Sequence, residues 1–287
     1  MFENSKILMS PKQLCSAMDE PNVVLLDTSW HLPTDNTSAL SEYHLAHIEG
    51  AHFFDIDEFS DPNHSCPHML PNEKDFSEKV TELGIGKDTD LILYDSKGLF
   101  SSPRVWWMFK TFGHHSVGIL DGGLPAWREF GGGLTGASSP IAKPDVSFEA
   151  RFDSNLVVDK DTVRQCLNES TAIVLDARSR NRFMGLEKEP RANVRRGHMP
   201  GARNLHYSNL LSNPIPTLKS KSELEDLFGS LGIKRGSAII TTCGSGITAC
   251  IVALALYQLG WTSVSVYDGS WADWGSDPNC PVEKDVA

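Results

Sequence analysis

The sequence predicts an α/β protein made of two tandem copies of one domain, each a parallel sheet flanked by helices on both faces. Three observations predict this class. Short apolar runs alternate with longer amphipathic stretches, the same landmarks occur twice in the same order, and a segment rich in Gly, Ser and Pro separates the two occurrences. Continuous apolar runs are typical of strands in parallel sheets, because such sheets are buried on both faces.

The internal repeat has a nearly constant offset, which predicts where the two domains lie. Four pairs of landmarks recur at separations of 147 to 151 residues: Asp27 with Asp176, His47 with His198, Asp95 with Cys243, and Asp121 with Asp268. We therefore predict one domain over residues 1–135, a linker over residues 136–152 and a second domain over residues 153–287.

The predicted elements follow the same order in each copy. The apolar runs are four residues long and are bounded by turn-forming or polar residues, so we expect them to be strands. They cover residues 23–26, 91–94 and 117–120 in the first copy and 172–175, 238–241 and 264–267 in the second. Longer apolar stretches at residues 103–112 and 248–260 predict helices after the second strand of each copy.

Composition excludes several classes of function. The net charge is −11 and the isoelectric point is about 5.3, which argues against nucleic acid or an anionic membrane as a partner. No stretch approaches the roughly 18–20 apolar residues of a membrane span. The amino-terminal residues show neither a secretory signal nor a transit-peptide pattern, so a cytoplasmic protein is expected.

The six cysteines do not form a recognisable framework. They are widely spaced and include no Cys-x-x-Cys pair, which fits neither a zinc ribbon nor a set of disulfides. We expect most of them to be buried, unreactive thiols, and we expect no metal site.

Cys243 is the exception, because it follows the predicted strand at residues 238–241 in the sequence TTCGSGITAC. Functional groups gather at the carboxyl ends of parallel strands. Gly244 and Gly246 let the backbone curl and turn its N–H groups inward, and a helix begins directly afterwards, with Thr248 expected to cap it. Such a loop stabilises an anion, so we expect the thiol to ionise readily. The alternative is a buried structural cysteine beside a tight turn.

The equivalent position in the first copy is Asp95, in a loop of different length, which indicates that only the second copy carries the chemistry. A cysteine phosphatase would need an arginine six residues after its cysteine, and Ala249 stands there. A papain-like Cys–His pair does not suit a strand–loop–helix setting.

Seven arginines lie between residues 178 and 203 of this acidic chain. Such a concentration indicates either a site for a small anion or a solvated loop paired with Glu187 and Glu189. Both interpretations remain open from the spacing alone.

The duplicated domain and the sequences HIEGA, HMPGA, YDGSW and CGSGIT resemble the rhodanese superfamily over essentially the whole chain, and within it the two-domain 3-mercaptopyruvate sulfurtransferases. The resemblance implies two tandem rhodanese-like domains and an enzyme in which Cys243 takes sulfur from 3-mercaptopyruvate as a persulfide and releases pyruvate. The sulfur then passes to cyanide, a thiol or thioredoxin, with no cofactor. The loop residues that would contact the donor are Gly244, Gly246, Ile247 and Thr248.

Further site residues are implied by the same resemblance. Arg182 and Arg191, in the pattern R-F-x6-P-R, would grip the carboxylate and ketone of the donor. Ser245, His68 and Asp57 would form a Ser–His–Asp set beside it. Rhodaneses that use thiosulfate carry a charged CRKG-type loop instead. A thiosulfate sulfurtransferase and a non-catalytic rhodanese-like binding module are the alternatives.

Overall fold

The computed structural model describes residues 7–142 and 144–284, which form two compact units. Each unit is α/β, as predicted. Unit 1 contains residues up to Pro62, Leu70–Asp153 and Ser212–Leu218, and unit 2 contains Asn63–Met69, Ser154–Leu211 and the residues from Lys219 onward.

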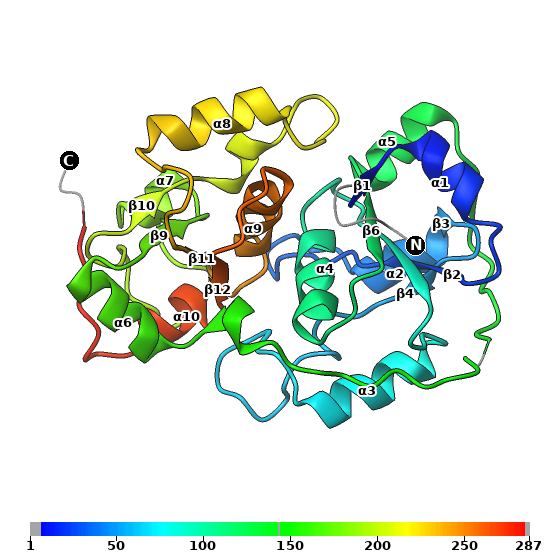
Figure 1. The fold of residues 1–287 in the computed structure, drawn as a ribbon, viewed down its shortest axis with the longest axis horizontal. Helices are drawn as coiled ribbons and strands as arrows, with labels where there is room; N and C mark the ends of the chain where they lie inside the picture. The colour runs from blue at the N-terminus through cyan, green and yellow to red at the C-terminus, as the bar shows by residue number, and fades with distance from the viewer. Residues whose placement is uncertain (1–6, 143, 285–287) are drawn as a thin grey trace. The chain divides into compact units, whose positions relative to one another are not determined.

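Unit 1 is built on a parallel sheet of five strands in the order β1-β6-β5-β2-β4 (Figure 1). The register places Leu25 of β2 beside Ile92 of β5. The strands are β1 (Leu8–Met9), β2 (Val23–Asp27), β4 (His52–Phe53), β5 (Asp90–Tyr94) and β6 (Val117–Leu120), and β3 (His47–Ile48) pairs separately with β7 (Leu134–Thr135). The three strands predicted for the first copy are confirmed.

Unit 2 repeats this topology, with the order β10-β9-β11-β12-β8 and β11 at the centre. The strands are β8 (Val157–Val158), β9 (Ile173–Asp176), β10 (Arg203–Asn204), β11 (Ile239–Thr242) and β12 (Val264–Tyr267). All neighbouring strands are parallel. The three predicted strands of the second copy are therefore confirmed as well.

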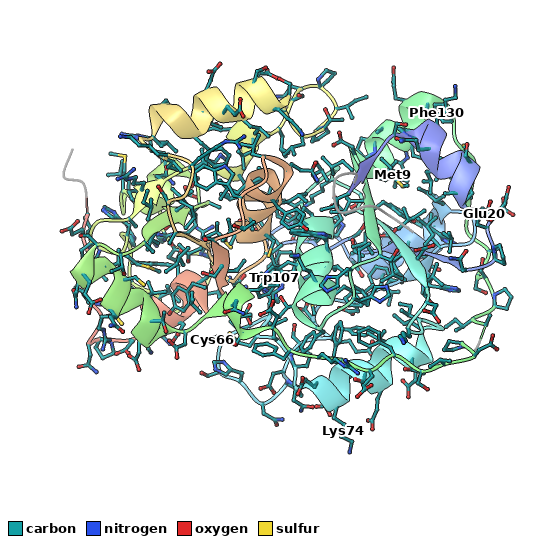
Figure 2. The ribbon with its side chains drawn as sticks, viewed as in Figure 1. Met9, Glu20, Cys66, Lys74, Trp107 and Phe130 are labelled. Carbon is teal, nitrogen blue, oxygen red and sulfur yellow. The ribbon has the colours of Figure 1, made fainter. Side chains whose placement is uncertain are left out.

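Helices cover both faces of the sheet in unit 1. Alternate residues of a strand point to opposite faces, so apolar strands place side chains on both faces that must be buried. Leu25 and Ile92 pack against Leu14 of α1 and Trp127 of α5. On the other face, α3 and α4 contribute an aromatic cluster, while Lys74 of α3 projects into solvent (Figure 2). The helices are α1 (Pro11–Ala17), α2 (Ala39–Leu45), α3 (Glu73–Glu82), α4 (Ser102–Thr111) and α5 (Gly123–Phe130).

The helices of unit 2 are arranged in the same way. Val163 of α6 and Trp271 of α10 pack with Ile240 on one face, and α9, which is buried almost all round, lies against β11 and β12 (Figure 1). The helices are α6 (Lys160–Glu169), α7 (Arg180–Phe183), α8 (Lys221–Ser230), α9 (Ala249–Gln258) and α10 (Ser270–Trp274), with 3-10 turns at Ser154–Leu156 and Tyr207–Leu210. None of the helices described is long and apolar enough to cross a membrane.

The repeat extends to single side chains. His47 stacks on Tyr43 and His198 stacks on Phe183, each with ring centroids 3.9 Å apart. In both pairs the imidazole Nδ1 lies within 3 Å of the backbone oxygen of the aromatic residue, at 2.6 Å and 2.9 Å. Both histidines are buried, so they fix a loop in each unit.

A short segment from each half of the sequence belongs to the unit formed by the other half. The first crossing segment is Asn63–Met69, in unit 2, and the second is Ser212–Leu218, in unit 1. They are equally long and lie 149 residues apart, the same offset as Asp27 and Asp176. The sequence predicted contiguous domains, and this exchange was not expected from it.

The second crossing segment is anchored at Asp121, after β6. The backbone N–H of Leu218 donates to Asp121 Oδ1 over 2.9 Å. A Cβ at Gly122 would lie 2.8 Å from Ile215 Cγ2 and 2.9 Å from Thr217 Cγ2, so glycine is needed for this close approach.

Asp121 should make the stability of the protein depend on pH. Burial raises the pKa of Asp121 to about 6 from 3.8, although the N–H groups of Leu218 and Gly122 act against the shift. A carboxyl group with a raised folded-state pKa contributes stability that is complete below pH 3.8 and is lost as the pH rises through about 6. We therefore expect wild type to lose about 2 kcal/mol relative to Asp121→Asn between pH 4 and 7, in urea unfolding at a series of pH values.

The exposed Asp88 supplies the matched control. The variant Asp88→Asn should follow the wild-type pH dependence. A constant difference between wild type and Asp121→Asn across this range would contradict the account of Asp121.

Candidate active site

Cys243 lies in the loop between β11 and α9, at the carboxyl end of the central strand of unit 2, and is 2% exposed. Its backbone N–H donates to Ser270 Oγ over 3.1 Å, and its carbonyl oxygen accepts from the N–H of Trp271 over 3.0 Å. Ser270 and Trp271 begin α10. This helix therefore fixes the backbone of the cysteine on both sides.

The loop after Cys243 presents a run of backbone donors. Gly246 has φ +82°, in the left-handed region that favours glycine, and Ile247 is buried. Within residues 7–142 and 144–284, the N–H groups of Gly244, Ser245, Ile247 and Thr248 donate to no protein acceptor. Unused donors at the amino terminus of a helix are suited to hold an anion.

The prediction that Thr248 caps α9 was wrong. Thr248 occupies the N-cap position, but its backbone is helical, with φ −74° and ψ −14°, and its side chain accepts no capping hydrogen bond. Side-chain capping requires an extended backbone at that residue. Cys250, the other thiol of the motif, is fully buried and donates to the carbonyl oxygen of Gly246 over 3.2 Å, so it supports the loop.

His68 and Arg191 meet at the hydroxyl group of Ser245. His68 Nδ1 lies 3.0 Å from Ser245 Oγ, and Arg191 Nη2 donates to the same oxygen over 3.3 Å. His68 comes from the first crossing segment and has φ +62°, a strained conformation for a residue with a side chain. Since Arg191 donates to Ser245, the serine hydrogen can point to His68 Nδ1 when the ring carries its proton on Nε2.

Arg182 lies against Gly244. A Cβ added at Gly244 would be 2.9 Å from Arg182 Nη2. Arg182 also donates to Glu189 Oε2, from Nη2 over 2.5 Å and from Nε over 3.2 Å. The side chain of Glu189 is only 3% exposed. The alternative interpretation predicted a pairing with Glu189 in a solvated loop. The pairing with Glu189 exists, but the Glu189 side chain is buried and not solvated.

Asp57 belongs to unit 1. Its Oδ2 accepts from Trp30 Nε1 over 3.1 Å, and its backbone N–H donates to Asp55 Oδ1 over 2.9 Å. Its place in a set with Ser245 and His68 stays a prediction.

Cys66 lies two residues before His68 in the first crossing segment and is labelled in Figure 2. Burial raises the pKa of the Cys66 thiol, and the nearby carboxylate of Asp273 adds to the increase. The thiol form is therefore favoured, which suits a packing residue better than a nucleophile. No group of three or more His, Cys, Asp and Glu side chains among the described residues could hold a metal ion.

The corresponding loop of unit 1 already contains an anion. Asp95 Oδ2 accepts from the backbone N–H groups of Phe100, Ser101 and Ser102, at 2.9, 3.1 and 3.0 Å, and from the hydroxyl group of Ser102 at 2.7 Å. Asp95 takes the place of Cys243 in the repeat. The Asp95 carboxylate thus accepts from the loop N–H groups of unit 1, whereas the corresponding loop of unit 2 has N–H groups without a protein acceptor among the described residues.

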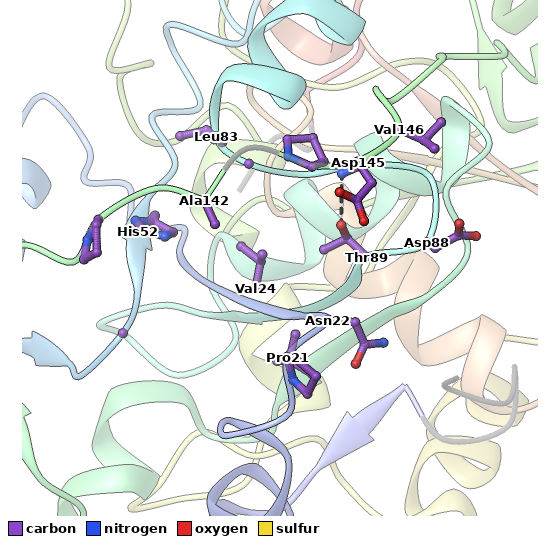
Figure 3. Close-up of a pocket in the computed structure, with 16 residues that line it drawn as sticks. Pro21, Asn22, Val24, His52, Leu83, Asp88, Thr89, Ala142, Asp145 and Val146 are labelled. Carbon is purple, nitrogen blue, oxygen red and sulfur yellow. Dashed lines mark hydrogen bonds between the residues drawn. The ribbon is translucent and has the colours of Figure 1, made fainter.

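A cavity of about 410 Å³ lies in unit 1, at the amino-terminal end of the sheet (Figure 3). Asn22 and Val24 line it, together with the chain after α3, where the N–H of Gly86 donates to Thr89 Oγ1 over 2.9 Å. Pro144 and Val146 also line it, and a Cβ added at Gly86 would lie 2.3 Å from the carbonyl oxygen of Val146. Its lining contains no cysteine or arginine, and ligands of such sheets bind at the opposite edge.

The most informative residues missed by sequence reasoning are those that fix Arg182. Arg178 is fully buried, and it donates to Glu189 Oε1 over 2.8 Å and to both carboxylate oxygens of Asp176. Its guanidinium also lies 4.3 Å from the ring of Trp271. The signal in the sequence was the arginine two residues after a strand that ends in aspartate.

The protein-family model of the rhodanese-like domain matches the chain at residues 10–130 and again at residues 159–277. The repeat found in the sequence and the two sheets of the structure thus coincide with two copies of that domain.

Several curated proteins are similar to the chain over most of its length. "Thiosulfate/3-mercaptopyruvate sulfurtransferase 1, mitochondrial" of Arabidopsis thaliana is 38% identical over 98% of this chain and 79% of its own length. The human 3-mercaptopyruvate sulfurtransferase is 38% identical over 94% of this chain and 92% of its own length. The crystal structure of SseA from Escherichia coli, described as a 3-mercaptopyruvate sulfotransferase, has a TM-score of 0.84 at 37% identity, covering 93% of this chain and 99% of SseA.

The loop of unit 1 should depend on the carboxylate of Asp95. In Asp95→Asn one acceptor oxygen is replaced by an NH2 group, and the four donors lose a charged acceptor, so we expect a loss of about 2 kcal/mol of unfolding free energy. Urea unfolding measures the change. The exposed Asp88→Asn should shift stability by no more than about 0.5 kcal/mol. Equal stabilities of the two variants would contradict the importance of this anion.

Proposed function

Because the chain belongs to the rhodanese family and carries a rhodanese-like domain in each half, we propose that it is a 3-mercaptopyruvate sulfurtransferase whose Cys243 carries the transferred sulfur. The observation that carries the proposal is the pairing of an uncharged Cys-Gly-Ser-Gly loop with two arginines from outside it. Arg182 lies on Gly244, and Arg191 binds Ser245. A small anion with one carboxylate suits this distribution of charge.

In the proposed reaction, the Cys243 thiolate attacks the sulfur atom of 3-mercaptopyruvate. An S–S bond forms, the C–S bond breaks, and its electron pair leaves with pyruvate as the enolate. The proton of the donor thiol ends on the methyl group of pyruvate, so the products are pyruvate and an anionic Cys243 persulfide. The unused N–H groups of Gly244, Ser245, Ile247 and Thr248 would stabilise the thiolate and the persulfide in turn.

The arginines would bind the rest of the donor. Arg191 and Arg182 can hold its carboxylate and ketone oxygen, and a cation beside the ketone stabilises the enolate as negative charge develops there. A thiosulfate-type loop would place an arginine at position 244. Arg182 Nη2 lies 2.9 Å from where a Cβ at that position would be, so an arginine there would require the Arg182 side chain to move and would place two cations side by side.

Ser245 would move the proton. Its hydroxyl group lies 3.0 Å from His68 Nδ1, which suits transfer of the donor's thiol proton through serine and imidazole. We propose that Asp57 orients His68 in this set. His68 is 5% exposed and Ser245 is 6% exposed, so bulk water would not compete for the proton.

The acceptor of the sulfur is proposed to be a thiol, thioredoxin or cyanide. Each can attack the outer sulfur of the persulfide and return Cys243 to the thiolate. The cytoplasmic location expected from the sequence stays a prediction, and one relative is described as mitochondrial.

Thiosulfate is the second candidate donor, because the Arabidopsis relative is named for both donors. It would be the poorer substrate here. It is a dianion, and the loop supplies no cation of its own.

The persulfide should form on Cys243 alone. After incubation with 3-mercaptopyruvate, the intact mass of the protein should increase by one sulfur atom, and pyruvate should appear in equal amount. The matched variants are Cys243→Ser and Cys250→Ser. We expect the first to lose sulfur transfer by about a thousandfold or more and the second to keep it. Sulfur gained by Cys243→Ser would refute the assignment.

Position 244 should control the use of 3-mercaptopyruvate. In Gly244→Arg, the new side chain displaces Arg182, so kcat/KM for this donor should fall by about tenfold or more in a cyanide assay. Gly229 is the control, since a Cβ there meets nothing within 4 Å, and Gly229→Arg should change kcat/KM by less than about twofold. Unchanged use of the donor by Gly244→Arg would place the donor elsewhere.

A further inference from the structure

We infer that Ser270 is a positioning residue for the proposed reaction, because its hydroxyl group ties the backbone N–H of Cys243 to the end of the neighbouring strand and so fixes the direction of the thiol. The inference rests on the proposed function and adds a residue that acts on the nucleophile through the backbone. Ser270 is the first residue of α10 and is 0% exposed.

Ser270 has a backbone conformation that serine rarely adopts. Its φ is +51°, in the left-handed region that favours glycine. A residue with a side chain is strained in this region and persists there only where surrounding contacts hold it. The contacts of the Ser270 side chain therefore explain why a serine stands at this position.

The hydroxyl group of Ser270 makes two hydrogen bonds. Its oxygen accepts from the N–H of Cys243 over 3.1 Å, and the hydroxyl group donates to the carbonyl oxygen of Tyr267 over 2.8 Å. Cys243 directly follows β11, and Tyr267 is the last residue of β12. One hydroxyl group thus links the carboxyl ends of two neighbouring strands.

The register of β11 and β12 shows what this link replaces. The N–H of Ile239 donates to the carbonyl oxygen of Ser263 over 2.9 Å. Donors of a parallel ladder advance by two residues on each strand, and Cys243 and Tyr267 are separated by the same number of residues as that first pair. The N–H of Cys243 is therefore in register with the carbonyl oxygen of Tyr267, and Ser270 Oγ bridges the two groups where the strands end.

The carbonyl oxygen of Cys243 is held by the next residue of α10. It accepts from the N–H of Trp271 over 3.0 Å. Since consecutive residues bind the N–H and the C=O of the cysteine, the peptide groups on both sides of its Cα are fixed, and the Cα–Cβ bond points in one direction. Only rotation about χ1 then remains to place the sulfur atom. A nucleophile held in this way loses little freedom when it aligns with the donor sulfur.

Unit 1 contains the carbonyl contact but has no side chain for the N–H contact. The N–H of Leu124 donates to the carbonyl oxygen of Asp95 over 3.0 Å, which matches the contact in unit 2. Gly123 takes the place of Ser270 in the repeat and has nearly the same conformation, with φ +49°. A Cβ at Gly123 would lie 2.4 Å from the carbonyl oxygen of Asp95. The carbonyl contact is thus common to both units, whereas the hydroxyl group belongs to the unit that carries the cysteine.

The test compares Ser270→Ala with Ser270→Gly in the full-length protein, with 3-mercaptopyruvate as donor and cyanide as acceptor. Both variants lose the hydroxyl group, and only glycine relieves the left-handed conformation. We expect kcat to fall by about tenfold or more in both variants. KM should stay within about twofold of wild type, because Arg182 and Arg191 are unchanged.

Thermal unfolding separates positioning from stability. Ser270→Gly should unfold about 2–4 °C above Ser270→Ala, because glycine is unstrained at this φ. An equal loss of kcat in two variants of different stability then follows from the missing hydroxyl group. Should Ser270→Ala fail to fold, Ser270→Gly alone tests the effect on kcat.

Ser276 supplies the matched control. It is exposed, and its hydroxyl group donates to the carbonyl oxygen of Asp273 over 2.9 Å. Ser276→Ala therefore removes a hydroxyl group that bonds to the backbone just after α10, and kcat should stay within about twofold of wild type.

Amide hydrogen exchange tests the contact without any donor. In protein with isotopically labelled cysteine, the N–H of Cys243 should exchange about tenfold faster or more in both Ser270 variants than in wild type. The N–H of Cys250, which donates to the carbonyl oxygen of Ile247 over 3.1 Å, should keep its rate.

Retention of kcat by either Ser270 variant, a rise of KM with kcat unchanged, or unchanged exchange at Cys243 would overturn the inference. Failure of wild type to take sulfur from 3-mercaptopyruvate would instead reject the proposed function itself.

Discussion

The buried guanidinium group of Arg178 is the charge that holds Glu189, and through Glu189 it holds Arg182 beside the loop of Cys243. An isolated cation in a protein interior is costly by several kcal/mol, so it must be paired and fully hydrogen-bonded. Asp176 supplies one carboxylate from the end of β9, and Glu189 supplies the other from the segment after α7. Because Trp271 of α10 packs on the same group, one ion ties together a strand, a helix and a loop that would otherwise be independent.

The two copies of the domain meet the same local requirement in opposite ways. A strand-end loop that turns N–H groups inward needs an anion, since buried donors without an acceptor are destabilising. In unit 1 the acceptor belongs to the protein itself, because Asp95 accepts from three backbone N–H groups and a hydroxyl group. In unit 2 the N–H groups of Gly244, Ser245, Ile247 and Thr248 have no protein acceptor among the described residues, so a bound anion could accept from them. The unit that is proposed to perform the chemistry is therefore the one whose loop N–H groups have no protein acceptor among the described residues.

Much of the fold was predictable from the sequence, because the information was local. Apolar runs of four residues placed six central strands, and the repeat paired Asp95 with Cys243. Contacts made by long side chains were not predictable in this way. The segment that contains Glu189 is polar and rich in charge, so it resembles a solvated loop, and only the tertiary structure shows that Arg178 draws this carboxylate into the interior. The prediction that Thr248 caps α9 was wrong because the local sequence did not reveal its backbone conformation, which is helical and follows from the loop before it.

The repeat in the sequence predicted contiguous domains and therefore did not predict the crossing segments. The two segments are nevertheless separated by the same number of residues as the repeated landmarks Asp27 and Asp176. Pro67 of the first segment corresponds to Pro216 of the second, and Cys66 corresponds to Ile215, which agrees with a packing role for that thiol.

The next pair in this alignment differs in chemistry. His68, which lies beside Ser245, corresponds to Thr217, whose methyl group lies 2.9 Å from where a Cβ at Gly122 would be. The duplicated scaffold thus differs between its copies at the two positions that the proposed chemistry needs most, the nucleophile and the imidazole. Because His68 comes from the amino-terminal half of the sequence and Cys243 from the other, neither half alone contains a complete unit 2. Exchange of the crossing segments made each unit dependent on the other half of the chain, and the same exchange brought a histidine to the loop of Cys243.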